Sequence, residues 1–181
     1  VTLGSKPDVP KFDLLNLPRP KREEPWGYVK IAEGCDRICG FCAIPSFRGP
    51  QRSRTIASIT EEIVSLDVQE IVLVAQDLAS YGKDQHGNSE NIIDLVKEVS
   101  TLVPWVRLLY LYPSSLTGEL VDIIANSPVP YFDLSLQHVS SPLLRKMRRW
   151  GNGERFSEII LLTLSIEPND LQHIIIFFDI L

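Results

Sequence analysis

The run Glu70-Ile71-Val72-Leu73-Val74-Ala75 carries the clearest indication of the fold. After Glu70 it is continuously apolar and rich in β-branched residues, which is typical of a strand buried on both faces. Strands of this kind belong to parallel sheets, because the crossovers between parallel strands are helices that cover the sheet. The run therefore predicts an α/β fold with a parallel sheet.

Patterns typical of strands and helices alternate on both sides of this run. Before it, residues 27–32 alternate like a first strand, and Ser58-Ile59-Thr60-Glu61 has the form of a capping box that opens a helix. After it, the predicted elements are a helix over 91–102, a strand over 105–111, a helix opened by Thr117 or Ser115, a strand over 131–136 and a helix over 141–150 entered through Pro142. We therefore expect about four βα units with right-handed crossovers.

Polar residues follow the predicted carboxyl ends of these strands. Gln76 comes directly after the central run, and Ser135 and Gln137 lie at the end of the strand over 131–136. In parallel α/β sheets, functional groups gather at this edge. Gln76, Ser135 and Gln137 are therefore candidates for lining a cofactor or substrate pocket, with an ordinary polar strand end as the alternative for each. His138 fits a structural role better than a functional one.

All three cysteines lie in one segment, Gly34-Cys35-Asp36-Arg37-Ile38-Cys39-Gly40-Phe41-Cys42, just after the first predicted strand. An odd number of thiols cannot pair off internally, and in a reducing compartment clustered cysteines are metal ligands more often than disulfides. Thiolates select iron–sulfur clusters or zinc. A four-iron cluster normally takes four cysteines, so three leave one iron open for a catalytic ligand. A zinc-stabilised, non-catalytic binding module remains an alternative, with His86 or His138 as a distant fourth ligand.

The Cys-x3-Cys-x2-Cys spacing resembles that of the radical-SAM superfamily, and the residues around it resemble the methylthiotransferases within it. Tyr28–Cys35, Cys42–Gly49 and Arg52–Arg54 carry this likeness, which covers about residues 25–160. It implies a partial radical-SAM (βα) barrel in which Cys35, Cys39 and Cys42 ligate a 4Fe-4S cluster and the open iron chelates S-adenosylmethionine. In that family a deoxyadenosyl radical, and no side chain, abstracts the hydrogen, so the resemblance implies no catalytic side chain.

Three segments distinguish two branches of the methylthiotransferases. Residues 74–82, 109–113 and 133–138 resemble the branch that modifies an aspartate of a small-subunit ribosomal protein. The alternative is the branch that modifies an adenosine of tRNA. The first branch implies a ribosomal protein as substrate and an electron donor protein such as a flavodoxin or a ferredoxin.

Composition limits the partners of the chain. The net charge of -5 argues against binding nucleic acid through bulk charge. The cations Arg145, Lys146, Arg148 and Arg149 lie late in a predicted helix, where they favour the carbonyl end, and they are also a candidate contact for ribosomal RNA. No run is long and apolar enough to cross a bilayer, and the N-terminus lacks a secretory signal pattern. We therefore expect a cytoplasmic protein without a membrane partner.

The likeness to the family does not extend over the whole chain. Residues 1–25 are rich in proline and read as a linker from an upstream domain, residues 26–160 as a partial radical-SAM core, and residues 161–181 as a divergent apolar tail. The upstream domain with three further cysteines and the later strands of the family are not in this sequence. We therefore expect a fragment, and an inactive truncated product is a further alternative.

Overall fold

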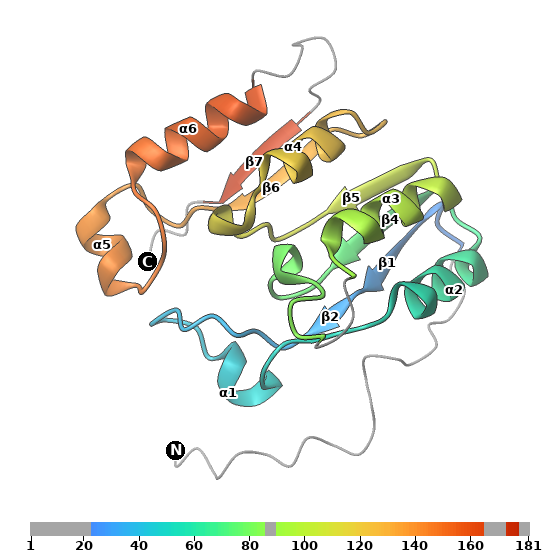
Figure 1. Ribbon diagram of the computed structural model, residues 1–181, viewed down its shortest axis with the longest axis horizontal. Helices are drawn as coiled ribbons and strands as arrows, with labels where there is room; N and C mark the ends of the chain where they lie inside the picture. Colours follow the sequence, from blue (N-terminus) through green and yellow to red (C-terminus); the bar gives the residue numbers. More distant parts are fainter. Residues whose placement is uncertain (1–22, 86–89, 165–172, 178–181) are drawn as a thin grey trace.

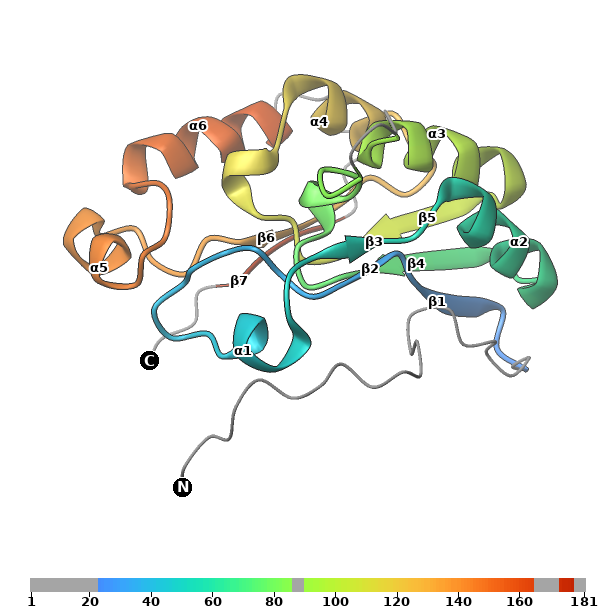
Figure 2. The same cartoon turned by 60° about the horizontal axis from the view of Figure 1, so that its bottom comes forward.

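The computed structural model describes residues 23–85, 90–164 and 173–177. Five parallel strands form its main layer: β1 (Trp26–Lys30), β4 (Glu70–Val74), β5 (Trp105–Leu108), β6 (Tyr131–Ser135) and β7 (His173–Phe177). The order is β1-β4-β5 in one sheet and β6-β7 in a second, and a parallel bridge from Leu111 to Leu134 joins the two. A layer of helices covers these strands (Figures 1 and 2). The predicted α/β fold with parallel strands is confirmed.

The central run forms β4, which pairs with β1 on one side and β5 on the other. Its residues Ile71, Val72 and Leu73 are buried, as expected for a strand covered on both faces. The helices over the strands are α2 (Ile56–Leu66), α3 (Ile92–Leu102), α4 (Gly118–Ala125) and α6 (Gly153–Leu164). Their apolar stripes complete one hydrophobic core; in α3 the stripe is Ile92, Leu95, Val96 and Val99.

The start of α2 differs from the predicted capping box. Thr55 is the N-cap, and its hydroxyl accepts a hydrogen bond from the backbone N–H of Ser58 at 3.3 Å. Ser58 lies inside the helix, and its hydroxyl accepts a hydrogen bond from Arg54 instead. The predicted start was wrong because a side chain from outside the helix occupies the proposed capping group. By contrast, Thr117 caps α4 as one of the two predicted openers.

Two predicted elements are shorter than their sequence patterns. The strand expected over 105–111 ends at Leu108, because Tyr110 adopts a φ of 63° that no strand accommodates. The helix expected over 141–150 ends early as α5 (Ser141–Lys146). Both elements therefore end in irregular backbone on the side of the fold that carries the cysteine segment.

The sequence analysis did not assign α6 or β7. The last residues of α6 and all of β7 fall within the segment expected to be a divergent tail, yet β7 pairs in parallel register with β6 from Tyr131–His173 to Ser135–Phe177. The remaining residues of the predicted linker and tail lie mostly outside the described residues, so the proposed domain boundaries stay a prediction. Within the described residues, no helix is long and apolar enough to cross a membrane.

Candidate metal and cofactor site

The cysteine segment begins directly after the short strand β2 (Ala32–Glu33), which pairs with β3 (Arg52–Ser53). The backbone N–H of Gly34 donates to Oε1 of Gln76 at 2.8 Å, and the N–H of Cys35 donates to the carbonyl of Gly49 at 3.1 Å. Gln76 follows β4, so the predicted strand-end residue is close to the cysteines. Its amide oxygen fixes the backbone that leads into Cys35.

Gly34 is required where the cysteine segment begins. Its φ is +86°, and a Cβ there would lie 2.1 Å from the carbonyl oxygen of Pro50. We expect Gly34→Ala to lower the free energy of unfolding by about 2 kcal/mol or more, through left-handed strain plus a backbone clash. Urea unfolding under anaerobic conditions would measure this change. Gly49→Ala is the matched control, since Gly49 also has a positive φ but its Cβ would meet nothing within 4 Å; equal losses in the two variants would contradict the close approach.

The three thiols share one electrostatic environment. Burial raises the pKa of the Cys35 thiol, the backbone N–H of Arg37 lowers it in part, and repulsion from Asp77, Cys39 and Cys42 raises it further. That N–H donates to the sulfur of Cys35 at 3.4 Å. Thiolates that repel one another in a partly buried loop are stabilised by a cationic group that binds all of them.

The three thiols do not form a site for a single metal ion among the described residues. Among the described residues, no three His, Cys, Asp or Glu side chains are grouped so that they could hold one metal ion. A zinc ion needs all of its ligands about 2.0–2.3 Å from one centre. Each thiolate of an iron–sulfur cluster, by contrast, binds a different iron and so stands further from the others.

The candidate zinc ligands give the same result. Nδ1 of His138 accepts a hydrogen bond from the backbone N–H of Ser140 at 2.8 Å, which is the structural role expected for it. His86 lies outside the described residues. The described part of the chain thus offers the zinc interpretation no fourth ligand.

Arg37 connects the cysteine segment to the ends of β4 and β5. Its guanidinium pairs with Asp77 at 2.6 Å, donates to the hydroxyls of Ser80 and Ser115 at 3.2 and 2.8 Å, and lies 3.9 Å from the ring centroid of Tyr112. These partners belong to or adjoin the 3-10 helices η1 (Leu78–Ser80) and η2 (Pro113–Ser115). The sequence analysis did not single out Arg37, because its partners are far away in the sequence.

Arg149 approaches the cysteines from the opposite side of the site. The end of α5 forms a Schellman motif, in which Arg148 has a φ of 52° and the N–H of Arg149 donates to the carbonyl of Leu144 at 2.8 Å. This turn brings the guanidinium of Arg149 within 3.6 Å of the sulfur of Cys39. The interpretation of Arg149 as a cation late in a helix was therefore wrong, since the helix has already ended.

A polar cavity of about 340 Å³ adjoins the cysteine segment. Its lining combines charged, amide and hydroxyl groups: Asp36, Arg37, Gln51, Asp77, Ser80, Lys83, Asp84, Ser114 and Ser115. Both amide atoms of Gln51 and Oδ1 of Asp77 are buried without a hydrogen-bond partner. Because buried polar atoms are almost always hydrogen-bonded, these orphaned atoms indicate that the cavity accommodates a polar ligand or water.

The end of β6 carries the other two predicted residues. The carbonyl of Ser135 accepts a hydrogen bond from Arg149, and Gln137 has a φ of 74° and a buried Oε1 without a partner. Left-handed backbone at a non-glycine residue is strained, and strain of this kind is often found at ligand sites. Gln76 contacts the cysteine segment directly and Ser135 is linked to it through Arg149, whereas Gln137 has no described contact with it; none of the three lines the cavity. Their binding of a cofactor stays a prediction.

Asp133 gives this edge of the sheet a pH dependence. Its side chain is buried, and burial raises the pKa of the carboxyl group, with partial compensation from the backbone N–H of Tyr110. Stability from this residue is therefore complete below the unfolded-state pKa of 3.8 and is lost as pH rises through the higher folded-state pKa.

We expect Asp133→Asn to remove this pH dependence, because the amide cannot ionise. Relative to wild type, the free energy of unfolding of the variant should improve when the pH is raised from about 3.5 to about 7.5. Urea unfolding at the two pH values measures the difference and cancels any constant effect of the substitution. A difference that does not change with pH would show that the carboxyl group ionises freely in the fold.

Comparison with known proteins places this site in a family. A family model described as the Radical SAM superfamily matches residues 29–166. This range contains the cysteine segment, the ends of β4, β5 and β6, and Arg149.

Curated relatives share much of the sequence. A protein of Sorangium cellulosum named ribosomal protein uS12 methylthiotransferase RimO is 46% identical over 145 residues, which are 74% of this chain and 30% of the relative. Two proteins of the same name also match. The one from Aquifex aeolicus is 42% identical over 165 residues, which are 87% of this chain and 37% of the relative. The one from Desulfotalea psychrophila is 50% identical over 129 residues, which are 67% of this chain and 29% of the relative. The chain spans about a third of the length of these relatives.

Two solved structures of TsrM, a radical S-adenosylmethionine methyltransferase from Kitasatospora setae, share the fold. Each aligns with a TM-score of 0.62 at 17% identity. Both alignments span 83% of this chain; they span 30% of the first TsrM chain and 28% of the second. One contains tryptophan and a SAM analog, and the other contains cobalamin and a [4Fe-4S] cluster. At this identity the likeness shows that the described strands and helices follow a radical-SAM architecture.

Proposed function

Because the chain belongs to the radical SAM superfamily, we propose that Cys35, Cys39 and Cys42 hold a 4Fe-4S cluster and that S-adenosylmethionine binds beside it. Bound together, these two groups supply radical hydrogen abstraction from an unreactive C–H bond. The observation that carries the proposal is the placement of three thiols in one segment next to a polar cavity with orphaned buried atoms.

The chain's own residues hold and shape this site. Gln76 fixes the backbone before Cys35, and Arg37 ties the segment to Asp77. The unpartnered atoms of Gln51 and Asp77 supply donors and acceptors for the polar part of the cofactor. The free Oε1 of Gln137 supplies a further acceptor at the end of β6. No side chain is assigned the hydrogen abstraction.

The reaction we propose is methylthiotransfer to an aspartate of a small-subunit ribosomal protein. The relatives named for this activity support it at 41–50% identity, as do the three segments over 74–82, 109–113 and 133–138. Modification of a tRNA adenosine is the second candidate and has no comparable support. Because the chain spans about a third of these relatives, the complete reaction belongs to the longer protein.

The partners follow from the same reaction. One electron has to enter the cluster for each cleavage of S-adenosylmethionine, so we propose an electron donor protein such as a flavodoxin or a ferredoxin. The exposed cations Arg145, Lys146 and Arg148 are a candidate contact for ribosomal RNA or an acidic partner. We therefore propose a cytoplasmic location, where a ribosomal substrate is found and cysteine thiols stay reduced.

An isotope experiment tests the substrate without requiring sulfur insertion. The chain, reconstituted anaerobically with iron and sulfide, is mixed with dithionite, S-adenosylmethionine and ribosomal protein uS12 deuterated at its aspartates. We expect 5′-deoxyadenosine that contains deuterium, because the hydrogen abstracted from the substrate ends in this product. Deuterium transferred only from deuterated tRNA would favour the second candidate, and no 5′-deoxyadenosine from a cluster-loaded chain would reject the proposed chemistry.

A further inference from the structure

We propose that Arg149 is a positioning residue that raises the reduction potential of the cluster through Cys39. The inference rests on the proposed function, since it requires a cluster on the three cysteines. Its basis is the juxtaposition of the guanidinium of Arg149 with the sulfur of Cys39, at 3.6 Å from Nη1. Arg149 is not one of the predicted ligands, and it acts on the cluster through one of them.

Several contacts hold this guanidinium against the cysteine segment. Its Nη2 donates to the carbonyl of Ser135 at the end of β6, and its central carbon lies 4.1 Å from the ring centroid of Tyr112. The backbone N–H of Trp150 donates to the hydroxyl of the same tyrosine at 3.2 Å. The segment is also attached from its own side, where the N–H of Gly40 donates to the carbonyl of Met147 at 2.8 Å. The guanidinium is therefore fixed by the turn after α5, by β6 and by Tyr112 at the start of η2.

Arg149 differs from the exposed arginines without a carboxylate partner, because its side chain is partly buried. Arg37, Arg48, Arg54 and Arg107 each pair with a carboxylate. Within residues 23–85, 90–164 and 173–177, Arg149 forms no such pair, and its Nε is buried without a hydrogen-bond partner. An uncompensated cation with an unused buried donor is costly unless an anionic group lies beside it.

A cluster on three thiolates is such an anionic group. One-electron reduction adds a further negative charge, part of which resides on the ligand sulfurs. A fixed cation that donates to one of those sulfurs stabilises the reduced form more than the oxidised form, and so raises the potential. Because the guanidinium is already oriented by Ser135 and Tyr112, little reorganisation opposes this effect.

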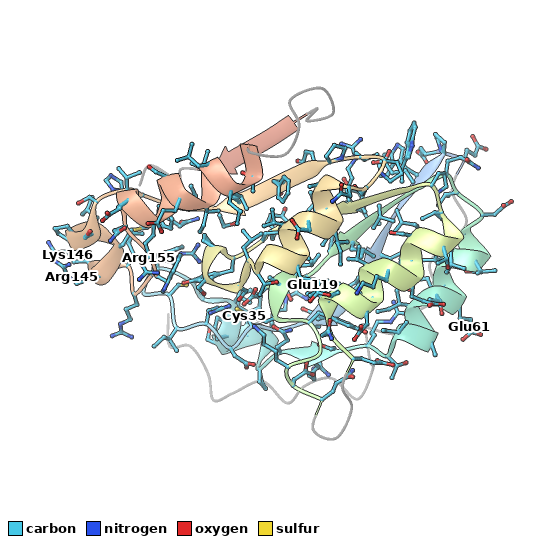
Figure 3. All side chains as sticks on the ribbon, turned by 45° about the horizontal axis from the view of Figure 1, so that its top comes forward. Cys35, Glu61, Glu119, Arg145, Lys146 and Arg155 are labelled. Carbon is cyan, nitrogen blue, oxygen red and sulfur yellow. The ribbon has the colours of Figure 1, made fainter. Side chains whose placement is uncertain are left out.

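The test measures the potential of the full chain and needs no turnover. Wild type, Arg149→Gln, Arg149→Lys and Arg145→Gln are reconstituted anaerobically, and iron and sulfide are counted. Each is then titrated with dithionite, which supplies the single electron, while electron paramagnetic resonance follows the reduced cluster. Arg145 is the matched control, because it is exposed near the outer end of α5 and also loses one positive charge (Figure 3).

We expect Arg149→Gln to shift the midpoint potential downward, so that the reduced fraction at a fixed potential falls by about tenfold. The midpoint potential of Arg149→Lys should lie between those of wild type and Arg149→Gln, because lysine keeps the charge but not the planar set of donors. Arg145→Gln should match wild type. If Arg149→Gln loads no cluster, the lysine variant decides, and a wild-type potential there overturns the inference.

Two other results also overturn it: a fully loaded Arg149→Gln cluster with the wild-type potential, or an equal shift in Arg145→Gln. A wild-type chain that binds no iron would instead refute the proposed function, so the two failures are distinguishable.

Discussion

Cys39→Ala is expected to abolish assembly of the cluster, lowering the iron and sulfide bound after anaerobic reconstitution by at least about tenfold. Two remaining thiolates cannot hold a four-iron cluster at three corners. The loss follows from the arrangement of the segment, in which Cys39 lies between Cys35 and Cys42 and the backbone N–H of Cys42 donates to its carbonyl at 3.2 Å. Iron and sulfide analysis together with visible absorption measures the outcome.

Ile38→Ala is the matched control for this prediction. Ile38 is the neighbour of Cys39 and is 73% exposed, so its truncation leaves the core intact. We expect this variant to bind iron and sulfide like wild type. A cluster content in Cys39→Ala equal to that of the control would remove Cys39 from the ligand set. A colourless wild-type chain with stoichiometric zinc would reverse the choice between cluster and zinc.

The sequence was sufficient to predict those strands and helices that have a local pattern of apolar residues. The apolar run of β4 and the stripe of α3 predicted elements that the structure confirms almost to the residue. Both patterns reflect burial of a whole face, which depends on many residues at once and so survives the details of their neighbours. The placement of Gln76 beside the cysteines could also be predicted, because all carboxyl ends of a parallel sheet meet at one edge.

At the site, contacts between residues far apart in the sequence decide the local structure, and no local pattern predicted these contacts. Both Thr55 and Ser58 are suitable capping residues, and only the position of Arg54 in space decides between them. The turn after α5 has arginine where such motifs usually have glycine, so nothing local indicated that the helix stops before Arg149. The partners of Arg37 are at least 40 residues away. Spacing alone was therefore enough to propose the three cysteines as ligands, whereas the residues that contact their segment could not be predicted from it.

Arg54 links several elements of the fold through its side chain and its backbone. The guanidinium of Arg54 forms a buried ion pair with Glu62 of α2 and donates to the carbonyl of Lys30 in β1 at 3.0 Å. Its backbone carbonyl accepts a hydrogen bond from the hydroxyl of Tyr81 at 2.6 Å. Arg54, which directly follows β3, thus joins β1 and α2 with the segment after η1.

Arg54→Met is expected to lower the free energy of unfolding by about 3–5 kcal/mol, because it removes the cation from a buried ion pair with Glu62. The side chains of Arg54 and Glu62 are only 5% and 10% exposed, so water cannot replace the lost partner. Urea unfolding of the cluster-free chain measures the change. Arg52→Met, which removes an exposed arginine of β3 just before Arg54, should change stability by no more than about 0.5 kcal/mol.

A double variant separates the buried charge from simple loss of packing. Arg54→Met combined with Glu62→Leu removes the buried carboxylate together with the cation, so we expect stability to recover by about 1 kcal/mol or more relative to Arg54→Met alone. Recovery would show that removing Arg54 alone is destabilising because a buried carboxylate loses its cation, as is usual when one partner of a buried ion pair is removed. If the double variant were less stable than either single variant, Arg54 would act through its hydrogen bonds to Lys30 and Ser58 instead. In that case the attachment of α2 to β1, and not charge compensation, would be the contribution of Arg54 to stability.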